Sequence, residues 1–158
     1  MASAEKKAYP LPLIYRLVFL FVEPAVALVR AYYIHSRPGE FLAMTHAGSA
    51  VGPVPTATVV ALSQFGNLYL LFAVNLTLVL RSTGNLRVWR ALLIGLLIAD
   101  IGHLYCFRPL GASIYWDVTR WNILHLANIP LAYACAALRI AFLAGVGLEG
   151  RTSPNKRQ

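Results

Sequence analysis

Long apolar runs alternate with short polar stretches along the chain. Each run has about 20 residues, the length that an α-helix needs to cross roughly 30 Å of hydrocarbon. Charged residues, prolines or polar turns bound the runs. The pattern predicts four membrane-spanning helices over residues 13–33, 56–80, 89–107 and 121–148, joined by connections of about 22, 8 and 13 residues.

Prolines fall at informative places in the first and last of these helices. Pro10 and Pro12 precede the first helix, where a residue without an N–H is tolerated. Pro24 lies inside the first helix and Pro130 inside the fourth, and an internal proline removes one helical hydrogen bond. We therefore expect a kink at Pro24.

The composition favours a membrane protein over a soluble one. Hydrophobic residues make up 58% of the 158 residues and charged residues only 13%, whereas soluble domains carry about 25% charged residues. Such a chain has too few polar side chains to cover a core in water, and its tails leave no room for a second domain. The sequence predicts a single transmembrane domain over residues 1–158, an all-α integral membrane four-helix bundle.

The net charge of +8 is spread over the helix ends, with no basic run interleaved with aromatic residues, so nucleic acid is not an expected partner. The termini and the second connection are expected on one side of the membrane, and this side carries more basic residues than the opposite side. Basic residues are retained in the cytoplasm, so the termini are predicted to be cytoplasmic. The first side holds Lys6, Lys7, Arg81, Arg87, Arg90, Arg151, Lys156 and Arg157, and the second holds Arg30, Arg37, Arg108 and Arg120.

Polar residues recur inside the predicted spans, where they are costly unless they face the bundle interior with partners or a function. At 1.5 Å per residue, seven of them fall in one layer roughly 5 to 16 Å below the non-cytoplasmic surface. They are Glu23, Gln64, Asn67, Asp100, His103, His125 and Asn128. Their spacing predicts a pocket with polar groups near one mouth and apolar walls elsewhere.

Such a pocket suits chemistry on a lipophilic substrate. A carboxyl group in a low-dielectric site resists ionisation, so Glu23 or Asp100 can act as general acid, with an imidazole or the other carboxylate as base. We therefore predict Glu23, Asp100, His103 and His125 as catalytic residues. Amides would orient oxygens, and aromatic faces would stabilise positive charge on carbon. The predicted substrate-binding residues are Gln64, Asn67, Tyr69, Trp116, Trp121 and Asn128.

Structural alternatives stay open for each of these residues. Glu23 could pair with Arg30, Asp100 could bond His103, and the amides could join helices. Arg139 is expected to neutralise a partner or to extend toward the surface. Tryptophans at the span ends commonly anchor helices at the interface. The histidines occupy separate segments without metal-ligand spacing, so we predict neither a metal nor another cofactor.

Most of the chain resembles a family of small fungal four-helix membrane proteins, some of them encoded in natural-product gene clusters. The segments that carry the likeness are PLPLIYRLVFLFVEPAVALVRAYY, LSQFGNLYLLFAVNLTLVLRSTGNLRVWRALLIGLLIADIGHLY and RIAFLAGVGL. Within that group the chain is similar to the membrane epoxide hydrolases or cyclases of polyketide pathways of the aurovertin and citreoviridin type. More distantly, it resembles the emopamil-binding, sigma-2-receptor-like superfamily and the membrane-bound terpene cyclases.

The resemblance implies an enzyme that opens epoxides of a polyketide-type substrate by hydrolysis or cyclisation in secondary-metabolite biosynthesis, in the endoplasmic reticulum membrane. It implies Glu23 and Asp100 as the acid and base pair, with His103 and His125 relaying protons. Alternatives are a sterol or terpenoid isomerase or cationic cyclase, and a subunit without turnover that binds lipid or a partner. The bilayer and further copies of the chain are the other expected partners. Unpaired carboxylates beside a lateral opening would favour catalysis, and a closed, fully paired core would favour a scaffold.

Overall fold

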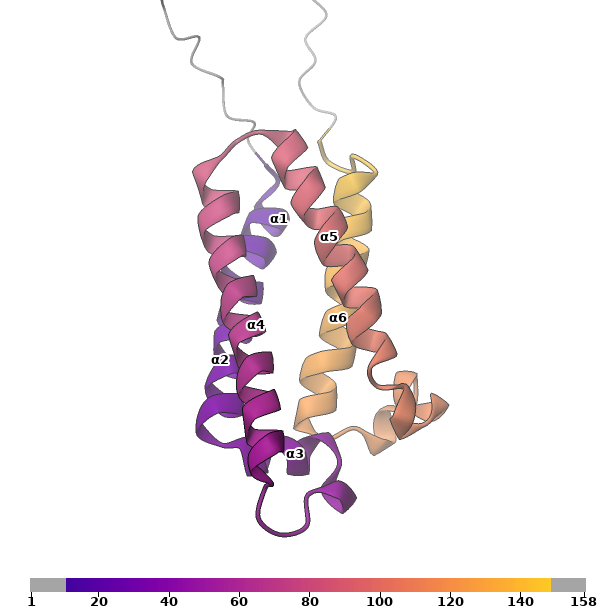
Figure 1. The fold of residues 1–158 in the computed structure, drawn as a ribbon. Coiled ribbons are helices and arrows are strands. Elements are labelled where there is room, and N and C mark those ends of the chain that lie inside the picture. The colour runs from indigo at the N-terminus through magenta and orange to yellow at the C-terminus, as the bar shows by residue number, and fades with distance from the viewer. Residues whose placement is uncertain (1–10, 149–158) are drawn as a thin grey trace, which may run out of the picture.

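The computed structural model describes residues 11–148, which contain helices and no strand (Figure 1). Four helical segments in this range are long and apolar enough to cross a membrane, and they cover Leu13–Ser36, Thr56–Ser82, Leu86–Leu110 and Ile123–Leu143. The all-α four-helix bundle is therefore confirmed. The main helices are α1 (Leu13–Leu17), α2 (Glu23–Ser36), α3 (Pro38–Thr45), α4 (Thr56–Ser82), α5 (Leu86–Tyr105) and α6 (Ile123–Leu143).

Capping interactions place the helix ends a few residues from their predicted positions. Asn122 caps α6 by accepting a hydrogen bond from the His125 amide at 3.0 Å. Gly145, with φ of 86°, ends the helix because its amide and the next one bond back to carbonyls of the last turn. The last helix therefore covers Ile123–Leu143 instead of 121–148. Asn85 similarly caps α5, which begins before the predicted position 89.

The first span contains a π-helical turn, Val18–Val22, directly before α2 instead of the simple kink expected at Pro24. Pro24 has no N–H to donate to the Leu20 carbonyl, which lies four residues earlier. Arg81 of α4 donates to this carbonyl at 2.9 Å. A widened turn and a side chain from the neighbouring helix thus accommodate the proline, and the span continues through the membrane.

The first connection contains α3, a helix that the hydropathy pattern did not predict. Pro38 occupies its first turn, and Arg37 pairs with Glu40 at 3.0 Å across that turn. Figure 1 shows α3 crossing the end of the bundle between the two halves. Asn122, the N-cap of α6, donates to the Met44 carbonyl. The helix therefore joins the ends of α2 and α6.

The four spans form two pairs, α2 with α4 and α5 with α6. Gly66 allows the first pair to pack closely, because a Cβ atom there would overlap the His35 ring. At the end that holds the α4–α5 connection, an apolar cluster joins the two pairs. Phe142 lies at its centre, with edge contact to Tyr15 and stacking on Trp89. Since lipid is as apolar as these side chains, close packing is what holds them together.

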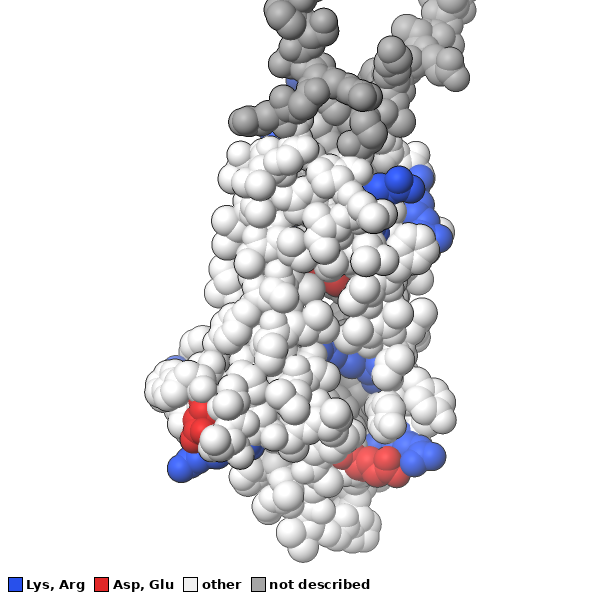
Figure 2. Space-filling view, turned by 180° about the vertical axis from the view of Figure 1, so that it is seen from behind, with Lys and Arg blue, Asp and Glu red and all other residues white. Residues whose placement is uncertain are grey.

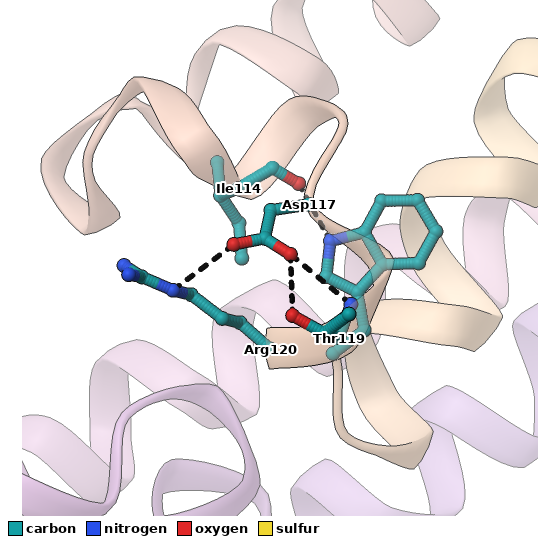
Figure 3. A network of polar contacts seen from close by, with 5 residues as sticks. Ile114, Asp117, Thr119 and Arg120 are labelled. Atoms are coloured by element: carbon teal, nitrogen blue, oxygen red, sulfur yellow. Dashed lines mark hydrogen bonds and ion pairs between the residues drawn. The ribbon is translucent and has the colours of Figure 1, made fainter.

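The connection between α5 and α6 folds into short 3₁₀ turns, Arg108–Leu110, Ala112–Tyr115 and Val118–Arg120. Asp117 accepts hydrogen bonds from the hydroxyl and amide of Thr119 and pairs with Arg120 at 3.0 Å (Figure 3). The hydroxyl bond is the main cause that holds the pKa of Asp117 below its usual value. These contacts order the connection that closes this end of the α5–α6 pair.

Candidate functional site

A cavity of about 660 Å³ lies between the two helix pairs. The apolar cluster around Phe142 closes the bundle on one side of it, and α3 contributes Phe41 and Thr45 on the other. Figure 2 shows red and blue atoms in a recess at mid-height of a largely white face, so charged groups are reached through an apolar flank. The polar lining residues include Glu23, Arg30, Tyr69, Asp100, His103, Asn128 and Arg139.

Two carboxylates share one guanidinium in the wall of this cavity. Arg139 donates through one terminal nitrogen to Glu23 at 2.6 Å and through the other to Asp100. Only 1% of the Arg139 side chain is exposed. Arg139 lies near the C-terminal end of α6, and its side chain tilts back along the helix toward the bundle interior. The cluster thus joins α2, α5 and α6.

This cluster is neither balanced in charge nor fully hydrogen-bonded. Two ionised carboxylates and one guanidinium carry a net charge of −1. Oε1 of Glu23 and Nε of Arg139 are buried without a hydrogen-bond partner among the described residues. The expected neutralising role of Arg139 is confirmed, whereas pairing of Glu23 with Arg30 is not observed. Both carboxyl groups contact Arg139, so the unpaired carboxylates that would have favoured catalysis are not observed.

His103 and Asn128 form a second polar contact in the cavity, at 3.2 Å between Nε2 and Oδ1. The Asn128 amide nitrogen donates to the Leu124 carbonyl at 2.7 Å, which turns the amide oxygen toward His103. His103 must then donate through Nε2, and in the neutral ring Nδ1 is left as the acceptor. The amide thereby selects a histidine tautomer that can accept a proton.

Arg30 and Tyr69 form the third polar feature of the lining. The Arg30 guanidinium lies 5.5 Å from the centre of the Tyr69 ring and donates to the Ala127 carbonyl of α6 at 2.7 Å. Ala127 follows Leu126 in the chain, and the Leu126 carbonyl lacks its usual helical hydrogen bond because Pro130, four residues later, has no N–H. Because a guanidinium has five N–H groups, Arg30 retains donors for a ligand oxygen.

Three predicted residues lie outside the cavity lining. His125 is buried, but its Nε2 donates to the Thr45 carbonyl at 3.3 Å, so it holds α3 against α6. Trp121 donates to the Ile114 carbonyl at 2.7 Å and packs within the α5–α6 connection. Trp116 is 68% exposed. These positions correspond to structural roles for His125 and Trp121, and Trp116 lies on the surface.

Gln64 and Asn67 are also outside the lining. Both are exposed on α4, whose contribution to the cavity comes from Phe65, Leu68, Tyr69 and Phe72. The prediction assumed that polar residues in a span face inward. Here the polar stripe and the cavity-lining stripe occupy different faces of one helix. Five of the ten predicted residues line the cavity, namely Glu23, Tyr69, Asp100, His103 and Asn128.

Sequence reasoning did not assign Arg30 and Arg139 to the site. A signal for Arg139 was present, because a lone arginine inside an apolar span needs a counter-charge and the chain offers only Glu23 and Asp100 within its spans. Arg30 was instead counted with the basic residues that set orientation. Nothing in the hydropathy pattern indicated the contribution of α3.

Comparison with protein families matches residues 8–149 to the family described as "Domain of unknown function (DUF7704)". The chain belongs to this family. The DUF7704 match includes all four spans and every lining residue of the cavity. Comparisons with curated proteins and with solved structures give no match. The resemblance to membrane epoxide hydrolases stays a prediction, and a functional argument rests on the chemistry of the cavity.

Proposed function

We propose that the cavity is the active site of an acid/base catalyst that opens epoxides of a lipophilic, polyketide-type substrate by hydrolysis or internal cyclisation. The observation that carries the proposal is the sharing of the single Arg139 guanidinium by Glu23 and Asp100 in a cavity wall. A purely structural ion pair needs one carboxylate for one guanidinium. The second carboxyl group is not required for charge pairing and is available for chemistry.

Charge balance favours one proton on this pair of carboxyl groups. A net charge in a low-dielectric interior is strongly disfavoured, and the bilayer around the bundle lowers the dielectric further. Protonation of either Glu23 or Asp100 makes the cluster neutral. The protonated carboxyl is then a general acid, and the ionised one stays paired with Arg139.

The reaction follows from these groups. The protonated carboxyl donates its proton to the epoxide oxygen as a carbon–oxygen bond of the ring breaks. Water, or a hydroxyl of the substrate, attacks that carbon from the opposite face and gives its proton to Nδ1 of His103 or to the carboxylate. Proton return from base to acid restores the site. Water attack yields a diol, and hydroxyl attack yields a cyclic ether.

The other cavity groups support this sequence of steps. Arg30 has N–H donors for the developing alkoxide or for a substrate oxygen. The apolar walls and the recess on an apolar flank favour entry of the substrate from the bilayer. The hydrogen bond of Asn128 keeps His103 in the tautomer that the base role requires.

Turnover of polyene epoxides by membranes that contain the protein tests the proposal. We expect diol or cyclic ether formation, with label from ¹⁸O-water only in the diol. Glu23→Gln and Asp100→Asn should each reduce kcat by about 100-fold or more, because each removes a proton-transfer group. Glu40→Gln is the matched control, since Glu40 pairs with Arg37 outside the cavity and should leave kcat unchanged.

Three outcomes would contradict parts of this proposal. Folded Glu23→Gln and Asp100→Asn proteins that both retain full turnover would remove the cluster from the mechanism. Conversion of a sterol isomer or a prenylated substrate, without turnover of epoxides, would indicate an isomerase or cationic cyclase. Saturable binding of such compounds without any turnover would indicate a lipid-binding subunit.

We further propose that both termini face the cytoplasm, with the protein in the endoplasmic reticulum membrane. The α4–α5 connection lies at the same end as the start of α1 (Figure 1). The adjoining helix ends carry Arg81, Arg87 and Arg90, and basic residues are retained on the cytoplasmic side. A glycosylation acceptor inserted between α3 and α4 should be modified in microsomes. One inserted between α4 and α5 should not be modified, and the reverse pattern would overturn this orientation.

A further inference from the structure

The outer face of α4 carries a regular seam of exposed side chains. Its positions follow steps of four and three residues in alternation, the spacing of a coiled-coil seam. All of them are exposed, and none belongs to the apolar clusters of the described bundle. The seam consists of Val60, Gln64, Asn67, Leu71, Val74 and Leu78.

The two amides of this seam lie within the first half of the span. Gln64 and Asn67 are eight and eleven residues after Thr56 in a helix of 27 residues, or roughly 12 and 16 Å from its start. Neither side chain makes a hydrogen bond or ion pair with another described residue. An amide in hydrocarbon that lacks a partner is strongly unfavourable.

We propose that the α4 seam is the interface of a homodimer in which α4 of one copy packs against α4 of a second copy. Amide side chains both donate and accept hydrogen bonds, so Gln64 and Asn67 are complementary to the same residues in another copy. Copies with the same topology place these residues at the same depth. A two-fold axis along the membrane normal then brings like positions together in a closed, parallel dimer.

The rest of the seam fits this partner. The apolar positions that interlock in a left-handed helix pair are Val60, Leu71, Val74 and Leu78, and the two amides fix its register and the number of strands. A different membrane protein would need amides at matching depth and spacing, which a second copy provides by symmetry. The seam therefore favours self-association.

Dimerisation through this face leaves the cavity accessible. The cavity-lining residues of α4, Phe65, Leu68, Tyr69 and Phe72, project from a different side of the helix. In Figure 1 α4 faces the viewer, and the recess with charged atoms is on the opposite face in Figure 2. A substrate can then reach each copy from the lipid, and the dimer does not depend on the proposed chemistry.

Subunit counting of the full-length protein in lipid bilayers at low protein-to-lipid ratio tests the interface. Wild-type protein should be dimeric. Gln64→Leu combined with Asn67→Leu should weaken association by roughly tenfold or more, because the interhelical amide bonds are lost. An unchanged melting temperature of its helical signal would show that the variant remains folded. A wild-type protein that stays monomeric would overturn the proposal and would indicate that a different membrane protein binds the seam.

Cysteine cross-linking locates the interface independently. With Cys106 and Cys135 replaced by Ala, Leu71→Cys should form a disulfide-linked dimer in membranes under mild oxidation. Leu70→Cys is the matched control, since this neighbour is also exposed but lies about 100° around the helix. Equal cross-linking at both positions, or none at Leu71→Cys, would overturn an α4–α4 contact.

Discussion

Arg139 is the most buried charged side chain in the described part of the chain. Its environment differs from those of the exposed pairs Arg37–Glu40 and Arg120–Asp117, which water can solvate. Exposed pairs contribute about 0 to 1 kcal/mol, whereas breaking a buried pair leaves a charge that nothing compensates. The arginine therefore keeps two carboxyl groups inside a membrane-spanning bundle.

Replacement of Arg139 by Met should lower the free energy of unfolding by about 3–5 kcal/mol, because Glu23 and Asp100 lose their counter-charge. Adding Glu23→Gln and Asp100→Asn to the same protein should recover most of the loss. The measurement is reversible unfolding in mixed micelles. Arg120→Met is the control with an expected change below about 1 kcal/mol. An Arg139→Met protein as stable as wild type would show that the cluster contributes nothing to folding.

Between elements, α2 and α4 pack closely at Gly66. The glycine is buried, and its missing side chain makes room for the His35 ring, whose Nδ1 donates to the Ala31 carbonyl at 2.9 Å. Small residues allow such approach in membranes, where dispersion forces between well-packed helices replace the hydrophobic effect. This contact fixes the α2 wall of the cavity relative to α4.

Gly66→Ala should destabilise the protein by about 1–3 kcal/mol, because the added methyl group overlaps the His35 ring. Gly95→Ala in α5 is the matched control. A Cβ atom at Gly95 meets no atom within 4 Å, and the change should be neutral or stabilising by up to about 1 kcal/mol. Thermal unfolding in nanodiscs compares the two variants. Equal effects would argue against a close α2–α4 contact.

Across the whole molecule, the two helix pairs meet at one end through the cluster around Phe142 and at the other through α3. Between these contacts the pairs leave the cavity. A bundle built only as a scaffold would close this space, since an unfilled volume loses packing contacts. The architecture therefore fits a protein that holds a ligand between its two halves.

Filling this cavity should block ligand access without unfolding the bundle. Ala99 of α5 lines the cavity and is exposed, so Ala99→Phe can place its ring in the open space. We expect KM for a lipophilic substrate to rise at least about tenfold, with little change in melting temperature. Ala91→Phe, at an exposed position of the same helix outside the lining, should leave both unchanged. Equal KM values for the two variants would contradict binding in this cavity.

The chain by itself determined the number of spans, the helical class and the presence of acids, imidazoles and amides inside the membrane. These are local properties, because span length and hydropathy depend only on neighbouring residues. Half of the site residues predicted from the sequence also line the cavity, including Glu23 and Asp100. The predicted ends of α5 and α6 were less accurate, because capping contacts among only a few side chains set where a helix begins or ends.

Only the tertiary structure decided which way each span faces. Gln64 and Asn67 point outward, His125 holds α3, and Arg139 joins two acids that are 77 residues apart, at positions 23 and 100. In a soluble helix the polar face marks the outside. In a membrane both the lipid and the packed core are apolar, so hydropathy does not distinguish the inner face from the outer one. Packing between helices makes that choice, and with it sets the composition of the cavity.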